Sequence, residues 1–305
     1  MADKSGIEWT DATVNFWWGC TKVGPGCDHC YAEAIDRRYG GTHWGLGAPR
    51  RKIKGAVALI HRLDNDYSWW SADHFGGFLP ATCGPRRRVF VQSMSDLLDT
   101  EVPLEWFAEA WEHIEACSRL AIQVVTKRVS VIEKRLAAIG RTSWPRHAGL
   151  IVTVVNQVEA GRDVPRLISL KKALSIPWIG LSIEPMLGPI DLTPWLADLD
   201  WIISGGESGP HARPMHPDWV RSIRDQCAAA GVPFHHKQNG EFASEGLCAE
   251  RWLFSPTGEA HPDPLPNGIG RHTKEGWTVV YRVGKRFAGR LLDGVVHNAF
   301  PEALQ

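Results

Sequence analysis

Short runs of apolar residues, many of them β-branched, recur along the chain, and each run ends in polar residues. Clear examples are residues 88–96 (Arg-Val-Phe-Val-Gln-Ser-Met-Ser-Asp) and 120–127 (Leu-Ala-Ile-Gln-Val-Val-Thr-Lys). Comparable runs follow at 150–157, 178–184, 200–207 and 232–238. Apolar runs of this length with polar flanks are typical of buried strands. The pattern therefore predicts a series of short strands.

Segments with apolar residues at helical spacing lie between these runs, at 103–117, 129–139, 164–174 and 218–230. Pro103 suits a first helical turn, and Gly140 and Gly231 each suit a helix end. Strands that alternate with helices pair in parallel, because each helix returns the chain to the same end of the sheet. The chain is therefore predicted to be an α/β protein, a partial parallel (β/α)6-type TIM-like barrel with loop insertions and a C-terminal extension.

Two regions do not follow this alternation. Residues 40–86 are rich in Gly, Trp, His and Arg, with a helix-like segment near 57–63, and residues 239–282 are loop-like and contain Pro262. A short basic helix is expected after Gly284. The predicted organisation is a barrel domain at 1–240, with a loop-rich insertion at 40–86, and a C-terminal extension or lid at 241–305.

Polar residues gather at the predicted carboxyl ends of the strands. They are Ser93, Ser95, Asp96, Thr126, Lys127, Asn156, Gln157, Glu184, Glu207, Ser208, Lys237 and Gln238. Active sites of β/α barrels lie at this rim. One such residue is more often a helix cap or a solvated loop residue, but their recurrence at successive strand ends indicates a site.

Composition narrows the class of protein. The 305 residues are 44% hydrophobic and 22% charged, which is ordinary for a globular chain. No apolar stretch approaches the roughly 18 residues of a membrane span, and the first residues lack the apolar core of a signal peptide, so a cytoplasmic protein without membrane contact is expected. Because 34 basic residues balance 34 acidic ones, nucleic-acid binding would depend on local patches. The candidates are the basic runs 50–52 and 86–88, and Lys285, Arg286 and Arg290.

The distribution of cysteines points to a metal in a reducing compartment. Three of the seven cysteines, Cys20, Cys27 and Cys30, have the spacing Cys-x6-Cys-x2-Cys in a segment rich in glycine. Three thiolates can hold a four-iron cluster with one iron left open, or form most of a zinc site. A zinc site would need a fourth ligand, for which His29, His43 and Cys83 are candidates. Cys117 and Cys227 fall in predicted helices and are expected in the core.

A helix is expected to start directly after Cys30, at 31–39. The N-terminal end of a helix presents free N–H groups and a partial positive charge. This setting is expected to lower the pKa of the nearby thiols.

Several motifs together resemble a phage-associated radical S-adenosylmethionine (SAM)-like family. They are Gly6-Ile-Glu-Trp-Thr-Asp-Ala-Thr, Gly19-Cys-Thr-Lys-Val-Gly-Pro-Gly-Cys, His29-Cys-Tyr-Ala-Glu, Ser182-Ile-Glu-Pro-Met-Leu-Gly-Pro and Gly205-Gly-Glu-Ser-Gly-Pro. The resemblance extends from about residue 6 to the segment that begins at Gly289. The usual spacing of the radical SAM superfamily is Cys-x3-Cys-x2-Cys, so the first gap here is longer.

The resemblance implies a site. Cys20, Cys27 and Cys30 would ligate a 4Fe–4S cluster, whose open iron would bind SAM. His29 matches an aromatic position near the adenine, and Ser93, Ser95 and Asp96 match in location a segment that binds the methionine amino group. The other expected contacts with SAM are Tyr31, Asn156, Glu184 and Glu207. Lys127, Glu184 and Glu207 are candidate catalytic residues, and Arg213, Lys237 and Gln238 are candidate substrate contacts.

The implied activity is reductive cleavage of SAM to a 5′-deoxyadenosyl radical, with electrons from a flavodoxin or ferredoxin. The expected substrate is a nucleobase, a nucleotide or a nucleic acid, which the enzyme would modify or repair. Two alternatives stay open on the residues alone. One is a non-catalytic nucleic-acid-binding protein with structural zinc, and the other is a barrel hydrolase or lyase that uses Glu184 and Glu207 as acid and base.

Overall fold

The computed structural model describes residues 2–66, 70–72, 85–245, 250–262 and 275–304. The chain forms two compact units. Unit 1 comprises Met1–Thr153, Pro165–Gly180 and Phe300–Gln305, and unit 2 comprises Val154–Val164 and Leu181–Ala299. The predicted domain boundary near residue 240 stays a prediction.

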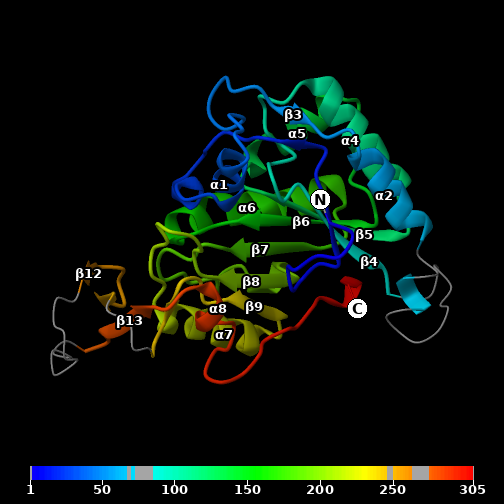
Figure 1. The fold of residues 1–305 in the computed structure, drawn as a ribbon. Coiled ribbons are helices and arrows are strands. Elements are labelled where there is room, and N and C mark those ends of the chain that lie inside the picture. Colours follow the sequence, from blue (N-terminus) through cyan, green and yellow to red (C-terminus); the bar gives the residue numbers. More distant parts are fainter. Residues whose placement is uncertain (1, 67–69, 73–84, 246–249, 263–274, 305) are drawn as a thin grey trace. The chain divides into compact units, whose positions relative to one another are not determined.

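Unit 1 contains parallel strands and the helices that connect them (Figure 1). The strands are β1 (Ala12–Val14), β4 (Arg87–Val91), β5 (Leu120–Thr126) and β6 (Ala148–Thr153), and β1–β4, β4–β5 and β5–β6 each pair in parallel. The helices are α1 (Tyr31–Arg38), α2 (Ala56–Asn65), α4 (Leu104–Ala116) and α5 (Ile132–Ala138). A short antiparallel pair, β2 (Trp17–Trp18) and β3 (Arg51–Lys52), precedes α2.

The core of unit 1 comes from the apolar positions that define its predicted strands and helices. Val89, Ile122 and Leu150 on adjacent strands are fully buried, as are Phe107 and Trp111 on one face of α4. Each such side chain contributes about 1.5–3 kcal/mol when it leaves water. The spacing of apolar residues therefore predicts these strands and helices, because the same residues form the core.

Unit 2 contains the parallel strands β8 (Trp201–Gly205) and β9 (Phe234–Gln238) and the helix α7 (Pro217–Ala230). The His216 side chain accepts from the N–H of Asp218, Pro217 occupies the first turn, and Gly231 ends the helix with φ 69°. An antiparallel sheet follows, with strand order β10 (Phe242–Ala243), β13 (Thr278–Arg282), β11 (Arg251–Phe254) and β12 (Ala260–Pro262). The helix α8 (Lys285–Ala288) comes next.

The predicted fold class is confirmed. The seven-stranded sheet has the order β1-β4-β5-β6-β7-β8-β9, with β7 at Ile179–Ile183 and helix α6 at Gln157–Leu174, so strands and helices alternate as in a partial parallel β/α barrel. Two local predictions are wrong. The region 239–282 is not all loop where it is described, and α6 begins at Gln157 instead of residue 164 because Pro165 is accommodated inside the helix. Among the described residues, no helix has both the length and the apolar character needed to cross a membrane.

Candidate active site

The cysteine loop, residues 19–30, begins directly after β2 in unit 1. Gly19 has φ +104°, and a Cβ atom there would lie 2.3 Å from the backbone oxygen of His43, so only glycine fits. Its N–H donates to the Met94 carbonyl at 3.4 Å, and the N–H of Gly45 donates to the Cys20 carbonyl at 3.0 Å. The glycine before Cys20 therefore allows the loop to pack closely against neighbouring backbone.

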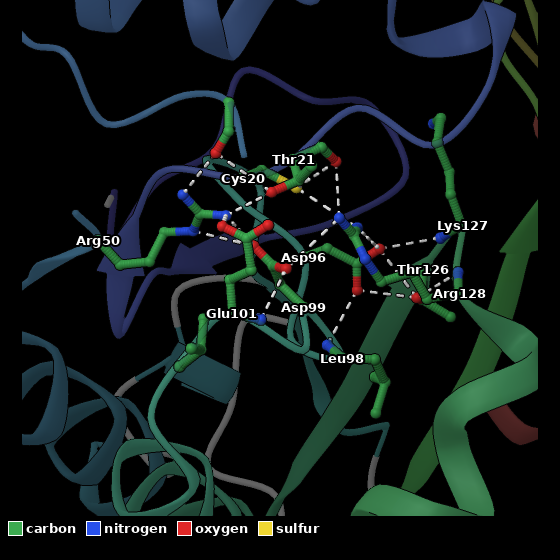
Figure 2. Close-up of polar contacts among 12 residues, drawn as sticks. Cys20, Thr21, Arg50, Asp96, Leu98, Asp99, Glu101, Thr126, Lys127 and Arg128 are labelled. Carbon is green, nitrogen blue, oxygen red and sulfur yellow. Dashed lines mark hydrogen bonds and ion pairs between the residues drawn. The ribbon is translucent and has the colours of Figure 1, made fainter. Parts of the chain in front are cut away.

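Arg128, which follows β5, joins the cysteine loop to Asp96 (Figure 2). Its Nη1 donates to Cys20 Sγ at 3.4 Å and to Asp96 Oδ2 at 3.0 Å, and its Nη2 donates to the Thr21 carbonyl at 2.6 Å. Asp96 also accepts from the Thr126 hydroxyl at 2.8 Å. The side chains of Arg128 and Asp96 are each 8% exposed. This buried pair, completed by further hydrogen bonds, supports Cys20.

A second buried arginine, Arg50, holds the same loop from another direction (Figure 2). Its Nε donates to Asp99 Oδ2 at 2.9 Å, and its Nη2 donates to Thr21 Oγ1 at 2.6 Å and to Glu101 Oε2 at 3.2 Å. Its Nη1 donates to the Ala48 carbonyl at 2.7 Å. The side chain is 2% exposed. Arg50 is therefore a structural residue and not the phosphate contact that its place in the basic run 50–52 suggested.

The other two cysteines lie on either side of a short turn. Cys27 ends a 3-10 helix, Pro25–Cys27, and Cys30 occupies the N-cap position of α1. All three thiols of the loop are free and half-buried. The Cys30 side chain makes no capping hydrogen bond to the helix, although the N–H groups at the start of α1 lie near its thiol. The expected helix directly after Cys30 is confirmed.

Cys20 and Cys30 do not have the lowered pKa values that the helix suggested. Burial raises the pKa of the Cys20 thiol to about 12, although the guanidinium of Arg128 acts in the opposite direction. Burial also raises the pKa of the Cys30 thiol, against the N–H groups of α1 and the ammonium of Lys127. The expectation is wrong because removal from water outweighs the nearby positive charges. Thiolates here would need a stronger positive partner, such as a metal centre.

Three thiols on one loop are the type of donor that binds three irons of a four-iron cluster. Of the candidate fourth ligands to zinc, His29 is half-buried, His43 pairs with Asp36 through Nδ1 (2.8 Å to Oδ1), a contact that does not involve Nε2, and Cys83 lies outside the described residues. Within the described ranges, no three His, Cys, Asp or Glu side chains form a group that could hold a metal ion. The ligands of a metal centre therefore stay a prediction.

Several residues predicted to bind SAM lie near the cysteine loop in unit 1. The Tyr31 hydroxyl donates to the Ser93 carbonyl at 2.5 Å, which joins the start of α1 to the end of β4. The Ser95 hydroxyl donates to the Trp17 carbonyl at 3.1 Å. Lys127 is close enough to Cys30 for its charge to act on that thiol. His29, between Cys27 and Cys30, is half-buried.

The second group of predicted site residues lies in unit 2, around the carboxylate of Glu184. This residue follows β7, and its Oε1 accepts from Lys237 Nζ at 2.7 Å and from Gln238 Nε2 at 3.1 Å. Burial acts to raise the pKa of Glu184, but the ion pair with Lys237 outweighs it and holds that pKa below its ordinary value. The side chains of Lys237 and Glu184 are 14% and 19% exposed, so a ligand can still reach them.

Glu207 holds Arg213 in the same unit. The Nε of Arg213 donates to Glu207 Oε2 at 2.8 Å and its Nη2 donates to Oε1 at 2.6 Å, a two-point contact that fits a carboxylate. The preceding Gly206 lies against β9, and a Cβ atom there would be 2.4 Å from the Asn239 carbonyl. A residue with a side chain at 206 would therefore collide with the backbone at residue 239.

The arrangement in unit 2 favours binding roles over acid–base catalysis. A general acid requires a pKa near the working pH, whereas the pKa of Glu184 is lowered and Glu207 is held by a guanidinium. Asn156 Oδ1 accepts from the N–H of Glu159 at 2.9 Å, so this side chain caps the start of α6. The proposed contact of Asn156 with SAM stays a prediction.

Sequence reasoning missed Arg128, Arg50 and Asp99 as parts of the site. Arg128 follows Thr126 and Lys127, so extending the strand-end rule by one residue would have included it. Arg50 gave no signal beyond its charge.

The other basic runs also contain paired side chains. Arg88 pairs with Asp11 at 2.7 Å, and the side chain of Arg290 donates to the His236 carbonyl at 3.2 Å. Both therefore have partners within the protein.

Over residues 4–301 the sequence matches the family described as Protein of unknown function (DUF5131), and the chain belongs to that family. No curated protein sequence matches it.

Solved structures of spore photoproduct lyase show a weak similarity. A double mutant with bound AdoMet and dinucleoside spore photoproduct is 12% identical with a TM-score of 0.39, over 70% of this chain and 60% of that chain. A single mutant is 11% identical with a TM-score of 0.43, over 75% of each chain. The present chain thus spans 60% of the first of these.

Proposed function

We propose that this protein is a radical SAM enzyme in which Cys20, Cys27 and Cys30 hold a 4Fe–4S cluster. The observation that carries the proposal is the set of three free thiols on one loop, which two buried arginines fix in place. When bound, such a cluster supplies the electron that cleaves SAM reductively. The expected electron donor is a flavodoxin or ferredoxin.

The proposed role of the surrounding residues in unit 1 is to bind and orient SAM. Tyr31, Ser93 and Ser95 border the cysteine loop and offer hydroxyl and backbone groups. The ammonium of Lys127 is proposed to attract the carboxylate of SAM, since its charge already acts on Cys30. His29 is proposed to lie near the adenine. Asp96 has a double role, because it also holds Arg128.

In unit 2 the proposed role of Glu184, Lys237, Gln238, Glu207 and Arg213 is to bind substrate. The cations of Lys237 and Lys285 both lower the pKa of Glu184, so two ammonium groups lie near this carboxylate. Cations beside amide and carboxylate groups suit a ligand with a phosphate and a hydrogen-bonding ring. The proposed substrate is a nucleobase, a nucleotide or a nucleic acid.

Anaerobic reconstitution with iron and sulfide, followed by reduction with SAM present, tests the proposal. The wild-type protein is expected to bind about four irons per chain and to release 5′-deoxyadenosine, measured by mass spectrometry. The triple variant Cys20→Ala, Cys27→Ala and Cys30→Ala should lose both.

Cys227→Ala is the matched control, because Cys227 is a buried thiol of α7 that belongs to neither site. It should bind iron and release 5′-deoxyadenosine like the wild type. One tightly bound zinc per chain with no iron uptake would overturn the proposal in favour of a zinc protein. Iron uptake without 5′-deoxyadenosine would remove the proposed chemistry.

A further inference from the structure

The short helix α8 presents exposed side chains to which the protein itself gives no partner. Lys285 and Arg286 are exposed, and neither side chain forms an ion pair or a hydrogen bond within the described part of the chain. The ring of Phe287 is 84% exposed, whereas Ala288 is buried. A lone exposed apolar side chain is ordinary, but an exposed ring next to two unpaired cations has the composition of a nucleic-acid contact.

The backbone fixes α8 at the place in unit 2 where β9 ends. Asn239 follows β9 directly, and its Nδ2 donates to the Ala288 carbonyl at 2.9 Å. The N–H of Asn239 donates to the Gly289 carbonyl at 2.9 Å, and at the other end of α8 the N–H of Gly284 donates to the Glu241 carbonyl at 3.0 Å. The exposed side chains are therefore carried by a helix that is held at both ends.

This anchoring places α8 beside the proposed substrate site. Lys237 and Gln238, the last residues of β9, hold the Glu184 carboxylate at 2.7 and 3.1 Å. Burial acts to raise the pKa of Glu184, and the charge of Lys285 is among those that lower it, so Lys285 lies near this carboxylate. Positive charge therefore continues from the site onto α8.

The kind of partner follows from the size and the chemistry of α8. A stable protein interface buries about 800 Å² on each side, and a helix that lies on a membrane needs a long apolar face. The four residues of α8, with one exposed ring, are too few for either. A nucleic-acid base needs only one ring to stack on, and each neighbouring phosphate needs only one cation. The side chains of α8 match this second set of requirements.

We propose that α8 is a nucleic-acid contact of the substrate site in unit 2, and that the substrate is a single strand or an unpaired stretch of a duplex instead of a free nucleotide. The ring of Phe287 stacks on a base next to the one that enters the site, and Lys285 and Arg286 pair with phosphates. The inference rests on the proposed substrate-binding role of unit 2 and adds the substrate class, because a contact outside the site serves only a ligand longer than one nucleotide.

Fluorescence anisotropy of the full-length protein, without added iron, tests this contact. The probes are labelled single strands of about 15 nucleotides, one of oligothymidylate and one of oligouridylate, which distinguish DNA from RNA. At least one strand should bind, and more weakly as the salt concentration rises. The matching 5′-mononucleotide should compete about a hundredfold more weakly than the unlabelled strand, because it lacks the contacts with α8.

Two changes in α8 connect the binding to this helix. Phe287→Ala should weaken binding about five- to tenfold, the effect of one lost stacking contact. The double variant Lys285→Gln and Arg286→Gln should weaken binding at low salt. It should also reduce the slope of log affinity against log salt by about 1.4, since each phosphate contact of a single strand contributes about 0.7.

The matched controls remove the same chemistry from other exposed positions. Tyr39→Ala removes a ring that is 75% exposed at the end of α1, and the double variant Lys134→Gln and Lys172→Gln removes two exposed charges. Both should bind the strands like the wild type. All the substituted side chains are exposed, so each variant should unfold at the temperature of the wild type.

Four results would overturn the inference. They are that neither strand binds, that Phe287→Ala and the double variant of α8 bind like the wild type, that the mononucleotide competes as well as the strand, and that phosphatidylserine vesicles bind to the wild type, but not to Phe287→Ala, while the strands do not bind. The last result would assign α8 to a membrane surface. Strand binding without release of 5′-deoxyadenosine would remove the radical chemistry and leave the role of α8 intact, and release without strand binding would do the reverse.

Discussion

The two groups of site residues differ in how far the protein satisfies their charges. In unit 1 the side chains of Arg50 and Arg128 are 2% and 8% exposed, and protein acceptors surround both. In unit 2 the side chains of Glu184 and Arg213 are 19% and 30% exposed; the partner of Glu184, Lys237, is 14% exposed, whereas the partner of Arg213, Glu207, is buried. Charges enclosed by protein hold a loop in place, whereas reachable charges can bind a ligand. The same residue types therefore form an enclosed frame in unit 1 and stay partly exposed in unit 2.

The largest effect is expected when the frame of unit 1 loses a charge. Arg50→Met leaves Asp99 buried without its main partner, which should lower the free energy of unfolding by about 3–5 kcal/mol. Arg141→Met is the matched control, because Arg141 forms an ion pair with Glu115 in which both side chains are about one-third exposed, and its loss should cost under about 1 kcal/mol. Urea denaturation followed by circular dichroism measures both. If both variants lost under about 1 kcal/mol of unfolding free energy, Arg50 would not hold the cysteine loop in place.

The two units should also differ in how their stability depends on pH. The buried guanidinium groups of unit 1 keep their charge at all ordinary pH values, whereas unit 2 contains a buried histidine that can titrate. His236 is fully buried, with Ser204 Oγ 2.9 Å from its Nδ1 and Asn239 Oδ1 2.8 Å from its Nε2. Burial lowers its pKa to about 4. As the pH falls from 6.5 towards 4, the unfolded chain takes up a proton that the folded chain does not, so stability falls.

Between pH 6.5 and pH 4 the buried His236 should lower the free energy of unfolding by about 3 kcal/mol, because each pH unit contributes about 1.4 kcal/mol. The difference in unfolding free energy between the wild type and His236→Gln, measured from pH 7 to pH 4, isolates this contribution. It should be constant above pH 6.5 and should change steadily below it. A difference that does not vary with pH would contradict the assignment, and so would a His236 ring signal in NMR that titrates near pH 6.5.

Most of the fold can be predicted from the sequence, because the apolar pattern of each strand or helix lies within one short segment. Each run such as 120–127 contains both the residues that make the strand and those that bury it. The strand Ala12–Val14 escaped prediction because three buried residues are too few to show a period, and its identity as a strand depends on pairing with β4. The antiparallel strands of unit 2 are likewise short, and partners from distant residues complete them.

The candidate site shows the same limit at the level of side chains. The sequence alone places the three thiols on one loop, because all three cysteines lie within one short segment. The role of Arg128 could not, because it contacts Cys20 across 108 positions, and Arg50 contacts Asp99 across 49. An arginine in the sequence does not indicate whether it will be buried. That depends on which carboxylates the fold brings to it.

The smallest effect is expected for the reachable pair of unit 2. A double-mutant cycle with Glu184→Gln and Lys237→Met should give a coupling energy of about 1–2 kcal/mol at pH 7, since the pair is partly buried and supported by Gln238. The pKa of Glu184 is lowered in the folded state, so this stabilisation is complete above its ordinary pKa and is lost as the pH falls through the folded value. Chemical denaturation of the four proteins at pH 7 and in acid measures it. A coupling energy as large as the loss in Arg50→Met would remove the distinction between an enclosed frame and a reachable contact surface.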